Sequence, residues 1–453
     1  MMQSLNPANG QIFSEVAPHA YAEVDRRLCI AHDRQRSWRA TSVRERRVVL
    51  MRIAATLRME KQRFAHLITM EMGKPIEEAK AEIEKCAITC EYYSDNAPRL
   101  LADEIVESAT RDSRVVLTSL GVLLAVMPWN YPFWQVIRTA VPAIAVGNTV
   151  VMKHAANVPQ CALALQEVFR LADVPEGLFT TLLIESGRVA SIIQDDRIAA
   201  VTFTGSTPAG RSIAAESGRV LKKHVLELGG SDPFIVLADA DIGEAARAAA
   251  KARFSNTGQS CISAKRFIVE DAVADAFVDA FVEEAMNYRT GDPLESATRL
   301  GPMARGNLRD ELHAQVAATI REGATLRCGG EVSCGEGYFY PATVLDHVQP
   351  GMTAATQETF GPAAAIIRVR DMDSAIEVAN STEFGLGAAV WTGDVSRGQA
   401  LARHVDAGAI FVNGIVASDP RLPFGGVKQS GYGRELGIWG LREFANVKTI
   451  CSA

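Results

Sequence analysis

Short apolar segments alternate with helix-like segments between residues 148 and 237, and this alternation restricts the fold more than any other feature of the chain. Its members are strands expected at 149–152, 182–184, 201–204 and 234–237, and helices expected at 159–172 and 208–217. Such alternation is typical of βαβ units, whose crossover helices cover both faces of a parallel sheet. The sequence therefore predicts a doubly wound α/β domain.

A second α/β region is predicted after residue 240. A helical region and an extended segment are predicted before the two α/β regions, and an edge strand after them. The second α/β region comprises helices near 241–254, 271–288 and 305–321, and strands at 266–269, 363–369, 388–391 and 409–412. The first ~100 residues are expected to be helical, because Ser42 and Glu45 have capping-box spacing before apolar residues at helical intervals. Segment 105–124 lacks a helical period and is predicted to form an extended hairpin or arm. Residues 447–450 are expected to add an edge strand, paired with another subunit.

Composition excludes several classes of protein. The chain has 453 residues and a formal net charge of −6, which argues against a nucleic-acid-binding surface. Its densest basic cluster, at 44–52, is interrupted by Glu45 and apolar residues and is interpreted as a solvated helix face. The N-terminus has no secretory-signal pattern, and the longest apolar stretch, 115–127, is shorter than the ~20 residues of a membrane span. We expect a cytoplasmic protein without a membrane segment.

The eight cysteines do not suggest a disulfide framework in so long a chain. There is no Cys-x-x-Cys motif, and the pairs Cys86–Cys90 and Cys328–Cys334 have no histidine at ligand spacing. We therefore expect no metal site, and burial as small apolar side chains for every cysteine except Cys261.

Cys261 follows the run Asn-Thr-Gly-Gln-Ser at 256–260, which is too polar for a core strand. Gly258 permits close backbone approach, and the small Ser260 leaves space beside the thiol. A free cysteine is mostly protonated at neutral pH, so a nucleophilic one needs a base or positive potential nearby. We predict that Cys261 is a nucleophile; the alternative is a buried core cysteine.

A carboxylate and a side-chain amide complete the groups that an acyl-enzyme needs. Glu227 ends an apolar segment before Gly229-Gly230, so it could move between water and substrate, and apolar neighbours would raise its pKa toward that of a general base. Asn130 could donate a hydrogen bond to a developing oxyanion. The alternatives are a surface glutamate at a strand end and a turn asparagine.

The evidence for a nucleotide site is weaker, because no Gly-x-Gly-x-x-Gly motif occurs. Residues 203–210 have the pattern of a strand, a small-residue turn and a helix start. Such a turn can present backbone amides and the helix dipole to a phosphate, although a plain βα turn has the same pattern.

Taken together, these residues resemble the aldehyde dehydrogenase superfamily over essentially the whole chain. The matching motifs occur in order: Pro128-Trp129-Asn130, Lys153, Phe203-Thr204-Gly205-Ser206, Glu227-Leu228-Gly229-Gly230, Gly258-Gln259-Ser260-Cys261, Glu358-Thr359-Phe360-Gly361-Pro362 and Pro423-Phe424-Gly425-Gly426. The resemblance implies a homo-oligomer, either dimer or tetramer, with three parts in each chain. These are a cofactor-binding domain at 1–100 and 120–229, a catalytic domain at 230–445, and a small β oligomerisation arm at 101–119 and 446–453.

By position, the resemblance implies that Cys261 is the nucleophile, Glu227 the general base and Asn130 the oxyanion donor. It implies cofactor contacts, with the ribose at Lys153 and Glu358, pyrophosphate at Ser206 and nicotinamide at Phe360, within the set Trp129, Lys153, Ala156, Gly205, Ser206, Leu228, Glu358 and Phe360. The implied reaction is thiolate addition to an aldehyde, hydride transfer to NAD or NADP, and hydrolysis of the thioester.

Ala156 departs from the pattern of NAD-preferring members, which carry a Glu three residues after the lysine. A carboxylate there would repel the 2′-phosphate of NADP, so its absence leaves room for that phosphate. We predict that NADP is accepted, and a preference for it over NAD stays open.

Arg138 bears on the choice of aldehyde. If a helix follows Pro132, Trp134 and Arg138 share one face, and an arginine there suits a distal carboxylate. The alternative is an arginine paired with a loop acid or a neighbouring subunit. The chain is similar to the short bacterial succinate-semialdehyde dehydrogenases, in which this arginine binds the substrate carboxylate and the positions of Ser260 and Ser418 also line the pocket.

Some relatives carry a second arginine where this chain has Ser255, which puts a two-arginine clamp in doubt. The predicted reaction is oxidation of an aldehyde to its acid, with succinate semialdehyde as the favoured substrate. One alternative is a broad-specificity aldehyde dehydrogenase with a structural Arg138. A CoA-acylating enzyme is disfavoured because Glu227 is present, and a catalytically silent relative because all three predicted catalytic residues are present.

Overall fold

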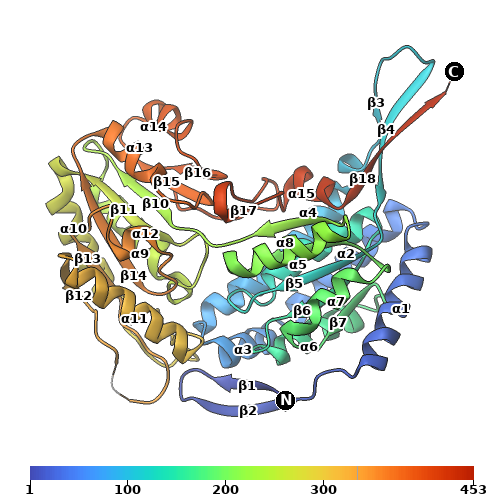
Figure 1. The fold of residues 1–453 in the computed structure, drawn as a ribbon, viewed down its shortest axis with the longest axis horizontal. Coiled ribbons are helices and arrows are strands. Elements are labelled where there is room, and N and C mark those ends of the chain that lie inside the picture. Colours follow the sequence, from blue (N-terminus) through green and yellow to red (C-terminus); the bar gives the residue numbers. More distant parts are fainter. Residues whose placement is uncertain (334, 453) are drawn as a thin grey trace.

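The computed structural model describes residues 1–333 and 335–452, so Cys334 of the cysteine pair considered above lies outside the described residues. Two large sheets, each between helices, lie side by side, and a narrow three-stranded sheet projects from the body (Figure 1). The predicted α/β class and the doubly wound arrangement are confirmed.

The first large sheet has six strands in the order β17-β9-β8-β5-β6-β7, and all but β17 run parallel to their neighbours. The strands are β5 (Val122–Met127), β6 (Thr149–His154), β7 (Phe179–Leu182), β8 (Ile198–Thr204), β9 (Lys223–Glu227) and β17 (Gly431–Tyr432). The helices beside them are α1 (Tyr21–Trp38), α2 (Val43–Met59), α3 (Lys61–Met72), α4 (Ile76–Leu100), α5 (Trp134–Val146), α6 (Pro159–Leu171), α7 (Val189–Gln194) and α8 (Thr207–Arg219), with a 3-10 turn at Ser186–Arg188.

Strand β5 shows how this sheet is buried on both faces. Val122 and Leu124 join an apolar cluster with α1, α7 and α8, whereas Leu123 and Ala125 join another with α2 to α6. Successive strand side chains point to opposite faces, so a continuous apolar run fits a strand that helices cover on both sides.

The second large sheet has seven strands in the order β12-β13-β14-β11-β10-β15-β16, and only β12 is antiparallel to its neighbour. The strands are β10 (Asp232–Val236), β11 (Ala264–Glu270), β12 (Thr325–Cys328), β13 (Thr343–Asp346), β14 (Ala363–Val369), β15 (Gly387–Trp391) and β16 (Ala409–Val412). Its helices are α9 (Ile242–Phe254), α10 (Asp271–Met286), α11 (Gly306–Arg321), α12 (Thr353–Thr356), α13 (Met372–Asn380) and α14 (Val395–Ala402). Phe234 and Val236 pack with α9 and α10, and Ile235 with α11, α13 and α14.

The projecting sheet contains β3 (Glu104–Ile105), β4 (Asp112–Ser119) and β18 (Ala445–Ser452), and the described C-terminal end lies at its tip (Figure 1). The extended segment predicted at 105–124 is therefore too long at its C-terminal end, because residues from Val122 onward enter the first large sheet. Within the chain β18 pairs along its length with β4 and forms one edge of this sheet, so the predicted pairing with another subunit stays a prediction for its other edge.

The N-terminal region differs from the helical prediction at residues 2–16, which are not helical. Strands β1 (Met2–Asn6) and β2 (Gln11–Val16) form a hairpin before the helices. Met2 and Ser4 of β1 are buried, and the Ser4 hydroxyl donates to the Glu71 carboxylate of α3, which fixes the hairpin on the body. The predicted capping box is confirmed, with Ser42 and Glu45 bonded reciprocally at the start of α2.

The cysteine prediction is confirmed for Cys86, Cys90 and Cys161, which are buried, and is wrong for Cys29 and Cys451, which are exposed. The latter two occupy outward positions on α1 and on the arm strand β18.

The domain limits remain predictions, although the sheets change near the same places. After β9 ends at Glu227 the chain enters the second sheet, and it returns at β17, next to β9, before α15 (Gly437–Glu443) and the arm. Across 1–333 and 335–452, no helix is both long and apolar enough to cross a bilayer. The same residues contain no group of three or more His, Cys, Asp or Glu side chains placed to hold a metal ion.

Candidate active site

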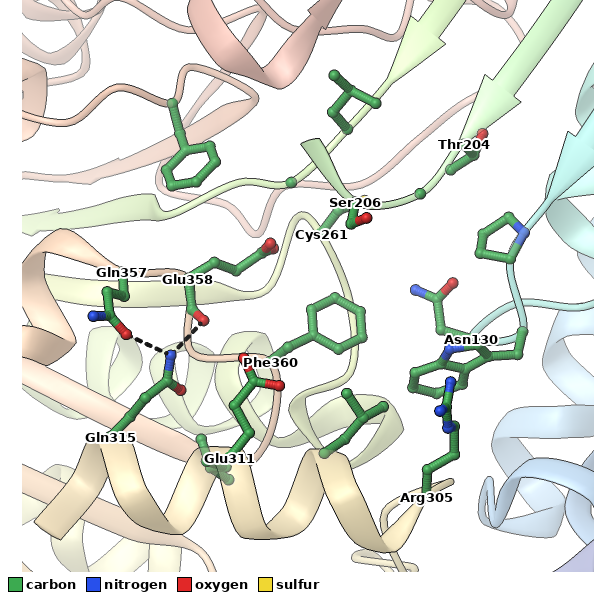
Figure 2. A pocket seen from close by; sticks show the side chains of 18 of the residues that line it. Asn130, Thr204, Ser206, Cys261, Arg305, Glu311, Gln315, Gln357, Glu358 and Phe360 are labelled. Atoms are coloured by element: carbon green, nitrogen blue, oxygen red, sulfur yellow. Dashed lines mark hydrogen bonds between the residues drawn. The ribbon is translucent and has the colours of Figure 1, made fainter. Parts of the chain in front are cut away.

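A cavity of about 610 Å³ lies where the two large sheets meet, and Cys261 is on its wall (Figure 2). Its lining comes from the loop after β5, the turn between β8 and α8, the end of β9, helix α11 and the segment before β14. The structure brings eight of the residues predicted from the sequence together here: Trp129, Asn130, Gly205, Ser206, Leu228, Cys261, Glu358 and Phe360.

A second cavity, of about 750 Å³, shares Trp129, Gly205 and Arg305 with the first, so the two form one groove. It runs along the carboxyl ends of β5, β6 and β8, which is where open parallel sheets bind ligands. Lys153 and Ala156 line it, and the Lys153 ammonium donates to the Ser186 hydroxyl at 3.3 Å.

Several features of this groove fit a dinucleotide. Ser206 precedes the first turn of α8 without capping it by its side chain, so backbone amides remain for a phosphate. Gly205 allows close approach, because a Cβ there would lie 2.5 Å from the Phe203 ring. Asn157 lines the second cavity, and its buried Nδ2 donor has no hydrogen-bond partner in the described part of the chain. The edge-to-face rings of Trp129 and Phe360, 5.8 Å apart, flank the end nearer Cys261.

The loop that carries Cys261 has an unusual backbone. Asn256, Thr257 and Gly258 all have left-handed conformations, with φ of 54°, 54° and 68°. Only glycine fits at position 258, because a Cβ would also lie 2.4 Å from the carbonyl oxygen of Gly361. Consecutive left-handed residues store strain that the surrounding structure must offset, and such strain is common at functional sites.

Two buried cations hold this loop in place. The Arg253 guanidinium donates to the carbonyls of Gly258 at 2.8 Å and Ala264 at 3.0 Å. The Lys265 ammonium donates to the carbonyls of Ser260 at 3.0 Å and Cys261 at 2.9 Å, and lies 3.6 Å from Glu358. The carbonyls on either side of the thiol are therefore bound, and the backbone position of Cys261 is fixed.

Asn130 is oriented toward the same loop. Its Nδ2 donates to the Gln259 carbonyl at 3.0 Å, and its Oδ1 accepts from Gln135 Nε2 at 3.2 Å. The bond from Gln135 determines which way the amide faces, so the donor rather than the acceptor points to the Cys261 loop.

The thiol is not ionised by this arrangement alone. Although Cys261 keeps some exposed surface toward the cavity, the pKa of the thiol is raised to about 12, chiefly by burial and to a smaller extent by the charges of Glu227 and Asp232. Arg138 and Lys265 oppose this shift. The thiolate therefore needs an additional positive charge or a base beside it.

Glu227 lies behind the cavity rather than on its wall. It is 2% exposed, and within the described residues neither carboxylate oxygen has a hydrogen-bond partner. Burial raises the pKa of this carboxyl well above its ordinary value, and the negative charge of Glu435 adds to the rise, whereas Arg138 and Arg434 oppose it. The direction agrees with the shift expected from the sequence.

Arg138 has a carboxylate partner within its own chain. It lies on α5 with Trp134 one turn before it, as predicted, but its guanidinium forms a buried ion pair with Glu435, which also accepts from Thr139. The Nε and Nη2 donors of Arg138 lack hydrogen-bond geometry despite this contact, so the charges meet without aligned bonds. The Phe424 ring lies 4.8 Å away on another side.

Two of the other predicted substrate residues, Trp134 and Ser418, are buried beside Lys85 of α4. Ser418 is 8% exposed and accepts from Lys85 Nζ at 2.7 Å, and that ammonium lies 4.2 Å from the centre of the Trp134 ring. Ser260 is buried beside Cys261 in the sequence. The structure thus places Trp134 and Ser418 around one lysine, and does not place them on the wall of the main cavity.

Sequence reasoning missed several residues of this site. Gln135, Arg253, Lys265 and Glu435 are all buried and polar, and each touches a predicted residue or its loop. Lys265 carried a usable signal, because a lysine at the second position of an apolar strand, four residues after the cysteine, needs buried partners. Gln135 lies in the apolar helix α5, where a single polar residue gives no sign of its partner, and Arg253 and Glu435 lie in a helix and a loop with charged neighbours in the sequence.

Comparison with known proteins identifies the family. The model for the aldehyde dehydrogenase family matches residues 1–450. The chain is 48% identical over 99% of its length, and 98% of the relative's, to a probable succinate-semialdehyde dehydrogenase (NADP(+)) of Synechocystis sp.. It is 47% identical, over 99% and 97%, to a succinate semialdehyde dehydrogenase (NAD(P)+) of Escherichia coli. A solved structure of succinic semialdehyde dehydrogenase from Streptococcus pyogenes with NADP+ superposes with a TM-score of 0.97 at 34% identity, covering 99% of each chain. The protein belongs to the aldehyde dehydrogenase family.

Proposed function

We propose that this protein oxidises succinate semialdehyde to succinate through a thioester on Cys261 and that it accepts NADP. The observation that carries the proposal is the position of Cys261, on the wall of a cavity continuous with a groove suited to a dinucleotide. The relatives described above are named for this substrate, and their names include NADP(+), NAD(P)+ or a complex with NADP+.

In the proposed reaction the Cys261 sulfur adds to the aldehyde carbon, and the carbonyl oxygen becomes an oxyanion. Asn130 Nδ2, which Gln135 orients toward the cysteine loop, donates to that oxyanion together with the Cys261 backbone amide. A nicotinamide cofactor held in the groove beside Cys261 would supply positive charge that favours the thiolate and would serve as the hydride acceptor.

Glu227 completes the proposed reaction as the base for hydrolysis. Its raised pKa suits it to accept a proton from water, and the hydroxide equivalent adds to the thioester carbon while the Cys261 sulfur leaves. Gly229 and Gly230 follow after Leu228 and allow the carboxylate to move from its buried position toward the cavity. This route releases the acid and not a CoA ester.

For the cofactor, we propose ribose contacts from Lys153 and Glu358, phosphate contacts at Ser206 and a nicotinamide contact from Phe360. Ala156 lines the second cavity and brings no carboxylate to the position where it would oppose a 2′-phosphate. Glu216 is an acidic residue on the same lining, but Arg219 lies 3.5 Å from it and Gln194 donates to it at 3.0 Å. NADP is therefore compatible with the charges of this groove.

For the substrate, we propose that Trp134, Arg138, Ser260 and Ser418 surround the chain of the semialdehyde and that Arg138 attracts its carboxylate. The ion pair between Arg138 and Glu435 favours a second candidate, a broad-specificity aldehyde dehydrogenase in which Arg138 is structural. The two differ in what they predict for an uncharged aldehyde.

A substrate panel with both cofactors tests the proposal. Succinate semialdehyde should exceed butanal by at least tenfold in kcat/KM, about 1.4 kcal/mol. In Arg138→Ala this ratio should fall; an unchanged ratio would assign Arg138 to structure, and equal turnover of both aldehydes by the wild type would reject the substrate assignment.

We further propose a cytoplasmic homo-oligomer. The three-stranded arm supports assembly, because it projects from the body and ends in edge strands that can pair or pack with a second copy (Figure 1). Light scattering of the full chain and of a variant lacking 446–453 would test this.

A further inference from the structure

Lys85 lies among the predicted substrate residues, although nothing in its sequence context suggested a role. It is on α4, and its Nζ donates to Ser418 Oγ at 2.7 Å and lies 4.2 Å from the centre of the Trp134 ring. An ammonium over the face of a tryptophan is attracted by the ring, and the serine fixes its position. Two side chains proposed to contact the substrate therefore hold a third group, which is a cation.

The charge of Lys85 is not matched by a carboxylate. Across the described residues, no Asp or Glu oxygen lies within 4.0 Å of its Nζ, and Ser418 takes one of its three N–H donors. Arg138, the cation first predicted for this role, already pairs with Glu435. Lys80, on the same helix, pairs with Glu77 at 2.8 Å. Lys85 thus differs from both in having no carboxylate partner for its charge.

The surroundings of Lys85 also favour an anion. The pKa of its ammonium is lowered to about 8, first by burial and next by the positive charge of Arg138, whereas Cys86, Glu82 and Asp419 oppose this shift. Of these, Asp419 is bonded to Arg421 and Glu82 to Lys74, so their charges are already paired. A bound carboxylate would offset both the burial and the repulsion.

We propose that Lys85, held by Ser418 and Trp134, binds the distal carboxylate of the substrate and sets the preference for a semialdehyde acid. This inference rests on the proposed function, because it requires a substrate with that carboxylate. Arg138 adds to the positive potential around the substrate carboxylate, since its charge lowers the pKa of both Lys85 and the Cys261 thiol. Lys85 is the specificity residue, and it takes no part in the bond changes at Cys261.

The test compares Lys85→Met, Lys85→Arg and the wild type on succinate semialdehyde and on butanal, with NADP saturating. Lys85→Met keeps the length of the side chain and removes its charge. We expect its kcat/KM ratio of succinate semialdehyde to butanal to fall on the order of tenfold to a hundredfold, mainly through KM. Lys85→Arg should recover most of the ratio, because the charge returns. The matched control is Lys80→Met, which removes a paired lysine from the same helix and should leave the ratio at the wild-type value.

Three outcomes overturn the inference. An unchanged ratio in Lys85→Met, in a wild type that prefers succinate semialdehyde, refutes the role of Lys85 while the proposed function stands. An equal loss on both aldehydes shows that the lysine supports the fold only. A wild type without preference refutes the proposed substrate, and the inference with it. As a measurement independent of turnover, succinate semialdehyde should bind Cys261→Ala more tightly than Cys261→Ala with Lys85→Met in equilibrium titration.

Discussion

Replacing Glu227 by Gln allows two effects of this carboxyl to be measured separately: its effect on the pH dependence of stability and its role as a base in turnover. Both oxygens of this 2% exposed carboxyl lack a hydrogen-bond partner within the described residues, and burial together with Glu435 raises its pKa well above 4.5. The folded state therefore holds the proton more tightly than the unfolded chain. The stability that follows is complete below pH 4.5 and is lost as the pH rises toward the folded-state pKa.

The size of the effect follows from linkage. Between the two pKa values, the wild type loses about 1.4 kcal/mol of unfolding free energy per pH unit from this group, and glutamine loses none. The difference in unfolding free energy between Glu227→Gln and the wild type should therefore shift in favour of the variant by about 1.4 kcal/mol for each pH unit above 4.5, until the pH reaches the folded-state pKa of Glu227. Urea unfolding at a series of pH values measures this, and differences that stay constant with pH would refute a buried carboxyl with a raised pKa.

The same variant tests the proposed base. A general base contributes roughly a hundredfold to ten-thousandfold in rate, so steady-state turnover should fall by at least a hundredfold. The first turnover needs no hydrolysis, so a burst of reduced cofactor equal to the enzyme concentration should remain in rapid mixing. Unchanged steady-state turnover would show that another group activates water.

Three further predictions use other residues. Ala156→Glu should lower the NADP-to-NAD ratio of kcat/KM by at least about tenfold, since a carboxylate there repels the 2′-phosphate, and initial rates with both cofactors measure it. Gly258→Ala should cost about 2 kcal/mol or more of unfolding free energy, because a Cβ would lie 2.4 Å from the Gly361 carbonyl in a backbone with φ of 68°; a wild-type urea midpoint would contradict this. The KM for succinate semialdehyde should rise as the pH passes about 8, where Lys85 loses its charge, and should stay flat there in Lys85→Arg.

The sequence predicted most of the large sheets because their strands are short apolar runs between helices with clear periods. The strands at 363–369 and 409–412 have the predicted limits, whereas the strand predicted at 182–184 lies at Phe179–Leu182, since its two threonines face a buried layer that hydropathy does not mark. The N-terminal hairpin was missed because only Met2 and Ser4 of β1 are buried, too few to form a pattern. The end of the extended segment predicted at 105–124 was misplaced because β4 and β5 follow each other with only Leu120 and Gly121 between them.

The site was predictable where chemistry concentrates in short motifs. Cys261, Asn130 and the groove residues occupy one cavity because those motifs lie at strand ends and tight turns. Lys85 and Glu435 were not predictable, since a lysine within a helix and a glutamate in a loop are usually solvated. Their roles depend on the residues that contact them from distant parts of the sequence, and a local sequence pattern does not predict those contacts.

One continuous segment connects the buried carboxyls of Glu227 and Glu435 to the arm. Gly431 pairs with Glu227 in the first sheet, Glu435 follows beside that carboxyl, and after α15 the chain becomes the outer strand β18. A tag or truncation at the C-terminus, or a neighbouring copy bound to β18, can thus displace the segment that begins at Gly431. That segment lies next to Glu227, the proposed base for water. Engineering of the C-terminus should for this reason be judged by turnover as well as by assembly.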